Sequence, residues 1–278
     1  MSTATYSLAL LGPPGVGKSS MAGSITEVVP AEEVLLIVAK PGEEKSWRYQ
    51  AAGLTEKAEI YHDPDWLPVL GSFKAEGFIA LMKRLKGLQK DTAFGAVIID
   101  PGTDVIGLLE HYLLAPSAKA SPGDLENTQG FYRQLKDTAE SFVKLATSLA
   151  SARVAARPKH ILIPWHVQPA KEGQVVGKGP ARAKVESADE RGAGIEYEGN
   201  VLFMLEGAYR RNIAGDFDLC LYMDFKPGIG NRPPEFFACP VPNADRHAKL
   251  RACPALSGTL PPTMKALLEA VEAAREGK

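Results

Sequence analysis

A glycine-rich loop near the start of the chain restricts the possible folds more than any other feature. Residues 12–19 read GPPGVGKS and match the pattern G-x-x-x-x-G-K-[ST]. An apolar run, residues 6–11, precedes the loop, and a stretch suited to a helix, residues 19–29, follows it. In this order of strand, loop and helix, the backbone N–H groups of the loop surround a phosphate group. The chain is therefore predicted to bind a nucleotide through its phosphates.

The loop and an acidic residue farther along the chain predict the cofactors ATP and Mg²⁺. Lys18 is expected to contact the β- and γ-phosphates, and the Ser19 hydroxyl is expected to bind Mg²⁺. A third apolar run ends in Asp100, a Walker B pattern in which the carboxylate holds Mg²⁺ through its water shell. The predicted nucleotide-binding residues are those of the loop and the first helical turn: Gly12, Pro13, Pro14, Gly15, Val16, Gly17, Lys18, Ser19 and Ser20.

Apolar runs that alternate with amphipathic stretches predict an α/β fold. Continuous apolar strands are typical of a mostly parallel sheet with helices on both faces. The expected strands are residues 6–11, 34–39, 95–99 and 160–165, and the expected helices are 78–88, 131–149 and 262–276. Further strand-like runs at 201–205, 219–225 and 236–238 predict an antiparallel C-terminal extension of the sheet. We expect a core of residues 1–240, with a flexible loop at 167–199, followed by a C-terminal tail and helix at 241–278.

Composition excludes several classes of protein. The 278 residues include 32 basic and 33 acidic side chains, so the chain as a whole is no basic nucleic-acid coat. Three cysteines, Cys220, Cys239 and Cys253, are too few and too widely spaced for a disulfide framework or a zinc site. The longest apolar runs have about six residues, whereas a membrane-spanning helix needs about 20. We therefore expect a cytoplasmic protein that makes no membrane contact.

The pattern as a whole resembles the RecA/RadA recombinase superfamily, and in particular the short phage ATPases that anneal single-stranded DNA. The resemblance is carried by the phosphate loop, by an acidic residue after the second strand, by Asp100, and by the helix at 131–149 and the strand at 160–166. It implies a RecA-like core that hydrolyses ATP and assembles with itself into a ring or filament. It also implies action on single-stranded DNA in recombination or annealing, in the cytoplasm of a phage host.

The resemblance and the local sequence together suggest further catalytic residues. Pro101 and Gly102 follow Asp100, so the catalytic glutamate that many ATPases have at this point is absent. Glu43 or Glu44, just after the second strand, is expected to orient the attacking water. By resemblance, His166 or Gln168 at the end of the fourth strand matches a sensor of the γ-phosphate, and Lys226 or Arg232 matches a finger that reaches the neighbouring subunit's nucleotide.

A basic stretch in the long loop is the candidate contact with DNA. It contains Lys171, Lys178, Arg182 and Lys184. An acidic stretch, residues 186–198, follows it and restores the charge balance. Such a loop suits sequence-independent binding to the DNA backbone, although it also suits a solvated surface. Two other functions stay open: an ATP-gated scaffold or loader of a phage replication complex, and a P-loop kinase for a small molecule.

Overall fold

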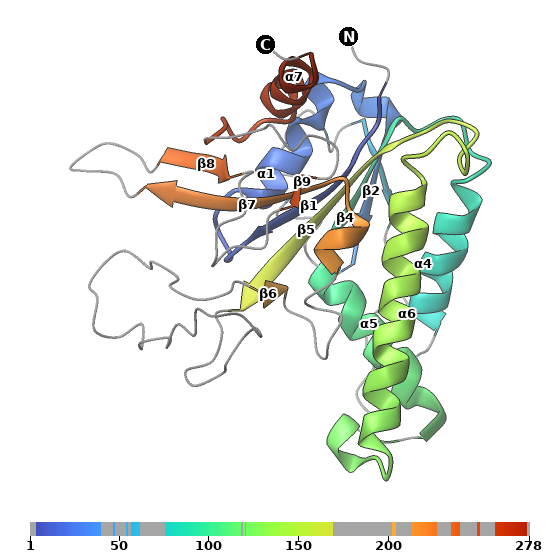
Figure 1. Ribbon diagram of the computed structural model, residues 1–278. Helices are drawn as coiled ribbons and strands as arrows, with labels where there is room; N and C mark the ends of the chain where they lie inside the picture. Colours follow the sequence, from blue (N-terminus) through green and yellow to red (C-terminus); the bar gives the residue numbers. More distant parts are fainter. Residues whose placement is uncertain are drawn as a thin grey trace, which may run out of the picture.

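The computed structural model describes residues 4–39, 47, 54, 57–61, 76–117, 119, 121–168, 202–203, 213–226, 235–239, 249–250 and 259–276 (Figure 1). Within these residues, nine strands form one sheet whose main order is β3-β2-β4-β5-β1-β7-β8. The phosphate loop follows β1, which lies between β5 and β7. The Walker B residue ends β4, which pairs with β5.

The strands confirm the predicted fold class, a P-loop core with a mostly parallel sheet and an antiparallel C-terminal extension. The parallel strands are β1 (Ser7–Gly12), β2 (Val34–Val38), β3 (Glu59–Tyr61), β4 (Ala96–Asp100), β5 (His160–Gln168) and β7 (Leu219–Lys226). The antiparallel strands are β6 (Leu202–Phe203), β8 (Glu235–Cys239) and β9 (Lys249–Leu250). The continuous apolar run of β4 before Asp100 follows from this arrangement, because side chains on both faces of the sheet are buried.

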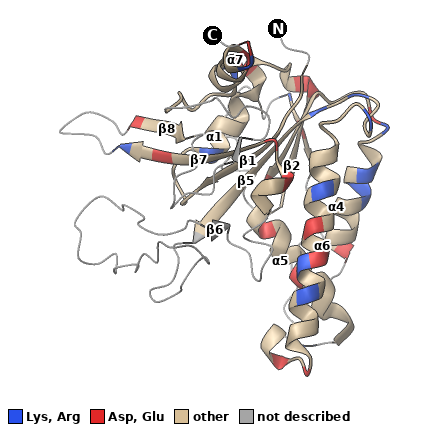
Figure 2. Ribbon diagram, in the orientation of Figure 1, with Lys and Arg blue, Asp and Glu red and all other residues tan. Residues whose placement is uncertain are grey.

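Helices cover both faces of the sheet (Figure 1). α4 (Glu76–Gly87), α5 (Gly102–Leu114) and α6 (Thr128–Ser148) share one apolar cluster with strand residues such as Val97 and Ile99. α1 (Lys18–Gly23) and α7 (Met264–Arg275) share the other cluster with Ile98. Alternate residues of β4 therefore pack on opposite faces, as the pleat of a strand requires. Figure 2 shows that many positions of α4 and α6 are occupied by charged residues, while few positions of the central strands are.

Several elements differ from the prediction. α5 was not among the expected helices: it begins at Gly102, directly after β4, and Pro101 occupies its N-cap position. The predicted first helix, residues 19–29, consists of the six-residue α1 and a 3₁₀ turn, η1 (Ser24–Glu27). Two more 3₁₀ turns, η4 (Ala115–Ser117) and η5 (Pro122–Asp124), lie between α5 and α6, and a further turn, η2 (Ala31–Glu33), precedes β2. The short strand β3 was not predicted.

The remaining fold predictions concern the cysteines, the membrane and the C-terminal helix. Cys220 and Cys239 are buried free thiols, as expected; Cys253 lies outside the described residues. In the described part of the chain, no helix combines the length and hydropathy needed to cross a membrane. The predicted C-terminal helix is α7, and its Met264, Leu267 and Val271 are fully buried in the same cluster as β1.

Candidate nucleotide-binding site

The loop between β1 and α1 requires glycine at several positions. Gly15 and Gly17 have φ angles of 82° and 83°, in the left-handed region that glycine adopts without steric cost. A Cβ atom at Gly12 would lie 2.7 Å from Val16 Cγ2 and 2.8 Å from the Met223 carbonyl oxygen. The backbone itself thus forms the surface of the loop, and a Cβ at Gly15 would point into open space.

Lys18 is held against this loop with only 6% of its surface exposed. Its Nζ donates hydrogen bonds to the carbonyl oxygens of Gly12 and Pro13, at 2.9 and 2.7 Å. Burial lowers the pKa of Lys18 from 10.5 to about 8, although the nearby charge of Asp100 acts in the opposite direction. A phosphate oxygen would give this ammonium a charged partner, and charge-assisted bonds are stronger than those to carbonyl groups.

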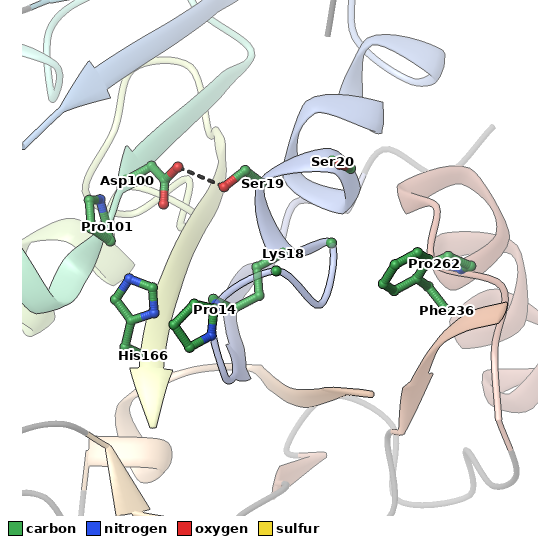
Figure 3. Close-up of a pocket in the computed structure, with 11 residues that line it drawn as sticks. Pro14, Lys18, Ser19, Ser20, Asp100, Pro101, His166, Phe236 and Pro262 are labelled. Carbon is green, nitrogen blue, oxygen red and sulfur yellow. Dashed lines mark hydrogen bonds between the residues drawn. The ribbon is translucent and has the colours of Figure 1, made fainter. Parts of the chain in front are cut away.

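Ser19 and Asp100 meet at the other side of the loop, as the sequence predicted for metal ligands. Ser19 Oγ donates to Asp100 Oδ2 at 2.9 Å (Figure 3). The same carboxylate oxygen accepts a hydrogen bond of 2.8 Å from Nε1 of Trp47, which is fully buried. A hydroxyl and a carboxylate side by side are the oxygen ligands that Mg²⁺ prefers, so these residues fit the metal. Trp47 was not predicted, because no motif distinguishes it.

A pocket of about 410 Å³ joins these groups, a volume within the usual range for small-molecule sites of about 300–1,000 Å³. Figure 3 shows Asp100 and His166 on one side of the loop, and Phe236 and Pro262 on the other. The pocket therefore has a polar end and an apolar end. Its lining residues are Pro14, Gly15, Gly17, Lys18, Ser19, Ser20, Asp100, Pro101, His166, Phe236 and Pro262.

The two sensor candidates belong to β5, the strand between β1 and β4. His166 is half-buried and lines the pocket. Its backbone N–H donates to Thr103 Oγ1 at 2.9 Å, which ties this end of β5 to the start of α5. Gln168 is the last residue of β5. The sensor role therefore stays a prediction, with His166 placed beside Asp100.

Of the remaining predicted residues, the structure describes only Lys226. It ends β7 opposite Glu235, and its Nζ lies 5.6 Å from the centre of the Phe237 ring. A contact with a neighbouring subunit stays a prediction. The others lie outside the described residues: Glu43, Glu44, Lys171, Lys178, Arg182, Lys184 and Arg232.

Sequence reasoning also missed the apolar end of the pocket. Phe236 was recognised only as part of a strand, and Pro262 only as the start of the last helix. These residues come together because β8 pairs with β7, and because residue 260 pairs with β8. Such long-range pairing leaves no local signal in the sequence.

Comparisons with known proteins add little to this geometry. No family model and no curated protein matches the chain. Among solved structures, flagellar accessory protein FlaH from Methanocaldococcus jannaschii matches with 11% identity and a TM-score of 0.37, over 84% of this chain and 76% of that one. A KaiC-like protein from Pyrococcus horikoshii matches with 10% identity and a TM-score of 0.40, over 92% and 84%. The function is therefore inferred from the site itself.

Proposed function

We propose that this protein is a RecA-like, Mg²⁺-dependent ATPase that acts on single-stranded DNA. The observation that carries the ATPase proposal is the convergence of Lys18, Ser19 and Asp100 on one pocket at the end of β1. Lys18 supplies a positive charge for the β- and γ-phosphates, the Ser19 hydroxyl supplies an oxygen ligand for Mg²⁺, and the Asp100 carboxylate would hold the metal through its water shell. When bound, Mg²⁺ neutralises the charge that develops on the transferring phosphoryl group.

Hydrolysis also needs a group that orients the attacking water. His166 lines the polar end of the pocket, on the same side of the loop as Asp100 (Figure 3). Glu44 precedes Trp47 by three residues, a span of at most about 11 Å along the chain. Because Trp47 is hydrogen-bonded to Asp100, its position supports the proposal that Glu43 or Glu44 is the catalytic glutamate that orients the water.

The proposed action on DNA rests on the sequence directly after β5. This strand carries His166 and ends at Gln168, and the basic stretch begins three residues later at Lys171. In the sequence, the four basic residues thus follow the strand that supplies His166 to the nucleotide pocket. Such residues bind the phosphate backbone of any sequence, with an affinity that falls steeply as salt rises. Assembly into a ring or filament would bring many copies of this weak contact to one strand, and would give Lys226 or Arg232 a neighbouring nucleotide to contact.

An assay of phosphate release with and without single-stranded DNA tests both halves of the proposal. We expect hydrolysis that requires Mg²⁺, rises with DNA, and is lost in Lys18→Ala. Lys265→Ala removes an exposed lysine from α7 and should leave the rate unchanged. A rate that survives Lys18→Ala would contradict the ATPase proposal, and the absence of DNA binding at low salt would contradict the DNA proposal. Bound ATP that persists without phosphate release would indicate a scaffold, and a phosphorylated acceptor would indicate a kinase.

A further inference from the structure

The apolar end of the nucleotide pocket is formed by two residues with no assigned role, Phe236 and Pro262. They lie on the far side of the phosphate loop from Asp100 and His166 (Figure 3). Ser20, on the first turn of α1, also lines the pocket. The pocket therefore continues past the loop, beyond the groups that phosphates and Mg²⁺ require.

The Phe236 ring lies close to the phosphate loop. A Cβ atom built on Gly17 would be 3.8 Å from Cδ1 of this ring, which is an ordinary van der Waals separation. Phe236 is paired across the β7–β8 hairpin with Phe225, and the two ring centroids are 6.0 Å apart at an interplanar angle of 42°. Phe225 is 44% exposed. The hairpin thus places an aromatic ring at the pocket and supports it with a second ring.

Pro262 is held in place by hydrogen bonds on both sides of it. Leu260 exchanges two backbone hydrogen bonds with Ala238 of β8, at 2.9 and 3.0 Å. The backbone N–H of Met264 donates to Ser24 Oγ at 2.8 Å, in the turn that follows α1. The C-terminal segment therefore forms a fixed wall of the pocket, attached to β8 and to the helix that follows the phosphate loop.

The polar and the apolar end of the pocket determine the orientation of a bound nucleotide. If the phosphates lie at Lys18, as the proposed function on which this inference rests requires, the base must lie toward the opposite end. We propose that Phe236 and Pro262 form the base subsite, in which the Phe236 ring stacks on the purine of the nucleoside triphosphate. Every base has a π face that an aromatic side chain can cover, and apolar walls with few polar groups are typical of such sites.

Stacking also determines how selective this subsite is. Among the described residues that line this end of the pocket, none carries a charged or amide side chain that would read the edge of the base. A purine presents more area to the ring than a pyrimidine does. The wild-type protein should therefore bind purine nucleotides more tightly than pyrimidine nucleotides.

Calorimetric titration of the full chain with two probes, in excess Mg²⁺, tests the subsite. The probes are the β,γ-imido analogue of ATP and inorganic tripolyphosphate, which has no base. Phe236→Ala should weaken binding of the ATP analogue by about tenfold or more, the usual loss for one stacked base, and leave tripolyphosphate binding unchanged. Phe236→Trp should keep the affinity for the analogue, whereas Phe236→Leu, which keeps apolar bulk without a ring, should lose most of it.

Phe237→Ala is the matched control, because Phe237 neighbours Phe236 on β8 but points to the opposite face, where Lys226 covers it. It should change neither affinity. Equal weakening of both probes by Phe236→Ala, or full affinity for the ATP analogue in that variant, would overturn the base subsite while the ATPase proposal stands. If the wild-type protein binds neither probe, the proposed function itself is wrong.

Discussion

The buried charge of Lys18, which nucleotide binding requires, should lower the free energy of unfolding of the protein. The substitution Lys18→Met tests this expectation. Burial lowers the pKa of Lys18 from 10.5 to about 8. A difference of this size corresponds to about 3 kcal/mol of unfavourable free energy of folding at neutral pH. Methionine has a similar length and carries no charge, so it should remove this cost.

The expected gain is smaller than the full cost. Methionine cannot donate to the carbonyl oxygens of Gly12 and Pro13, although water in the open pocket can replace those bonds. Asp100 also loses a favourable positive neighbour. We therefore expect Lys18→Met to be more stable than the wild type by about 1–3 kcal/mol at pH 7, within the range that one charged, buried group can contribute.

The stability difference between the wild type and Lys18→Met should depend on pH. Below pH 8 both the folded and the unfolded wild-type chain bind the Lys18 proton, so the full cost is present. Between pH 8 and 10.5 the unfolded chain keeps the proton and the folded protein releases it, so wild-type stability rises relative to the variant. The advantage of Lys18→Met should therefore shrink as the pH rises above 8.

Urea unfolding followed by circular dichroism, from pH 7 to pH 10 without nucleotide or Mg²⁺, measures this difference. Lys265→Met replaces an exposed lysine on α7 and should change the free energy of unfolding little at any pH. The reasoning would be refuted by a Lys18→Met variant that is less stable than the wild type at pH 7. A stability difference that stays constant across this range would refute it equally.

Three further predictions concern other buried groups. In α5, Gly102→Ala should lower the free energy of unfolding by about 1–3 kcal/mol in thermal or urea unfolding, because its Cβ would lie 2.6 Å from Ile163 and Trp165. Gly107→Ala is the control: its Cβ would meet no atom within 4 Å, so it should be neutral or stabilising. Burial lowers the pKa of His160 to about 4, so only the unfolded chain gains this proton between pH 6.5 and pH 4, and wild-type stability should fall over this range. In acid unfolding experiments, His160→Asn should show a smaller fall. Trp47→Phe removes the hydrogen bond to Asp100 and should raise the Mg²⁺ concentration for half-maximal phosphate release about tenfold; an unchanged Mg²⁺ requirement would contradict this role.

The parts of the site that are local in sequence were predictable, and those that depend on distant pairing were not. The phosphate loop and Asp100 follow apolar strands, and parallel strands bring their carboxyl ends to one edge of the sheet, so Ser19 and Asp100 could be expected to meet. His166 was suggested by the family resemblance, and its place in the pocket agrees with the same rule. Phe236 reaches the pocket only because β8 turns back on β7, a register that no residue near Phe236 specifies.

The missed helix α5 also depends on a contact between elements that are distant in the sequence. Asp-Pro-Gly is typical of a turn, yet α5 starts directly after Pro101, which has the extended backbone angles of an N-cap residue. Gly102 is needed there because α5 lies against β5 so closely that any Cβ would overlap Trp165. A sequence pattern cannot distinguish these two uses of proline and glycine, because the difference depends on the neighbouring strand.

The hydrogen bonds of Asp100 suggest how metal binding is connected to the rest of the site. One oxygen of this carboxylate accepts bonds both from Ser19 of the phosphate loop and from Trp47. Trp47 follows the two predicted catalytic acids along the chain and packs in the same apolar cluster as Met21 of α1. A Mg²⁺ ion held by the Ser19 hydroxyl and, through its water shell, by Asp100 would compete for this shared oxygen, and Trp47 is the buried partner whose hydrogen bond would change. Trp47, three residues after Glu44 in the sequence, is therefore attached to Asp100 by a buried hydrogen bond.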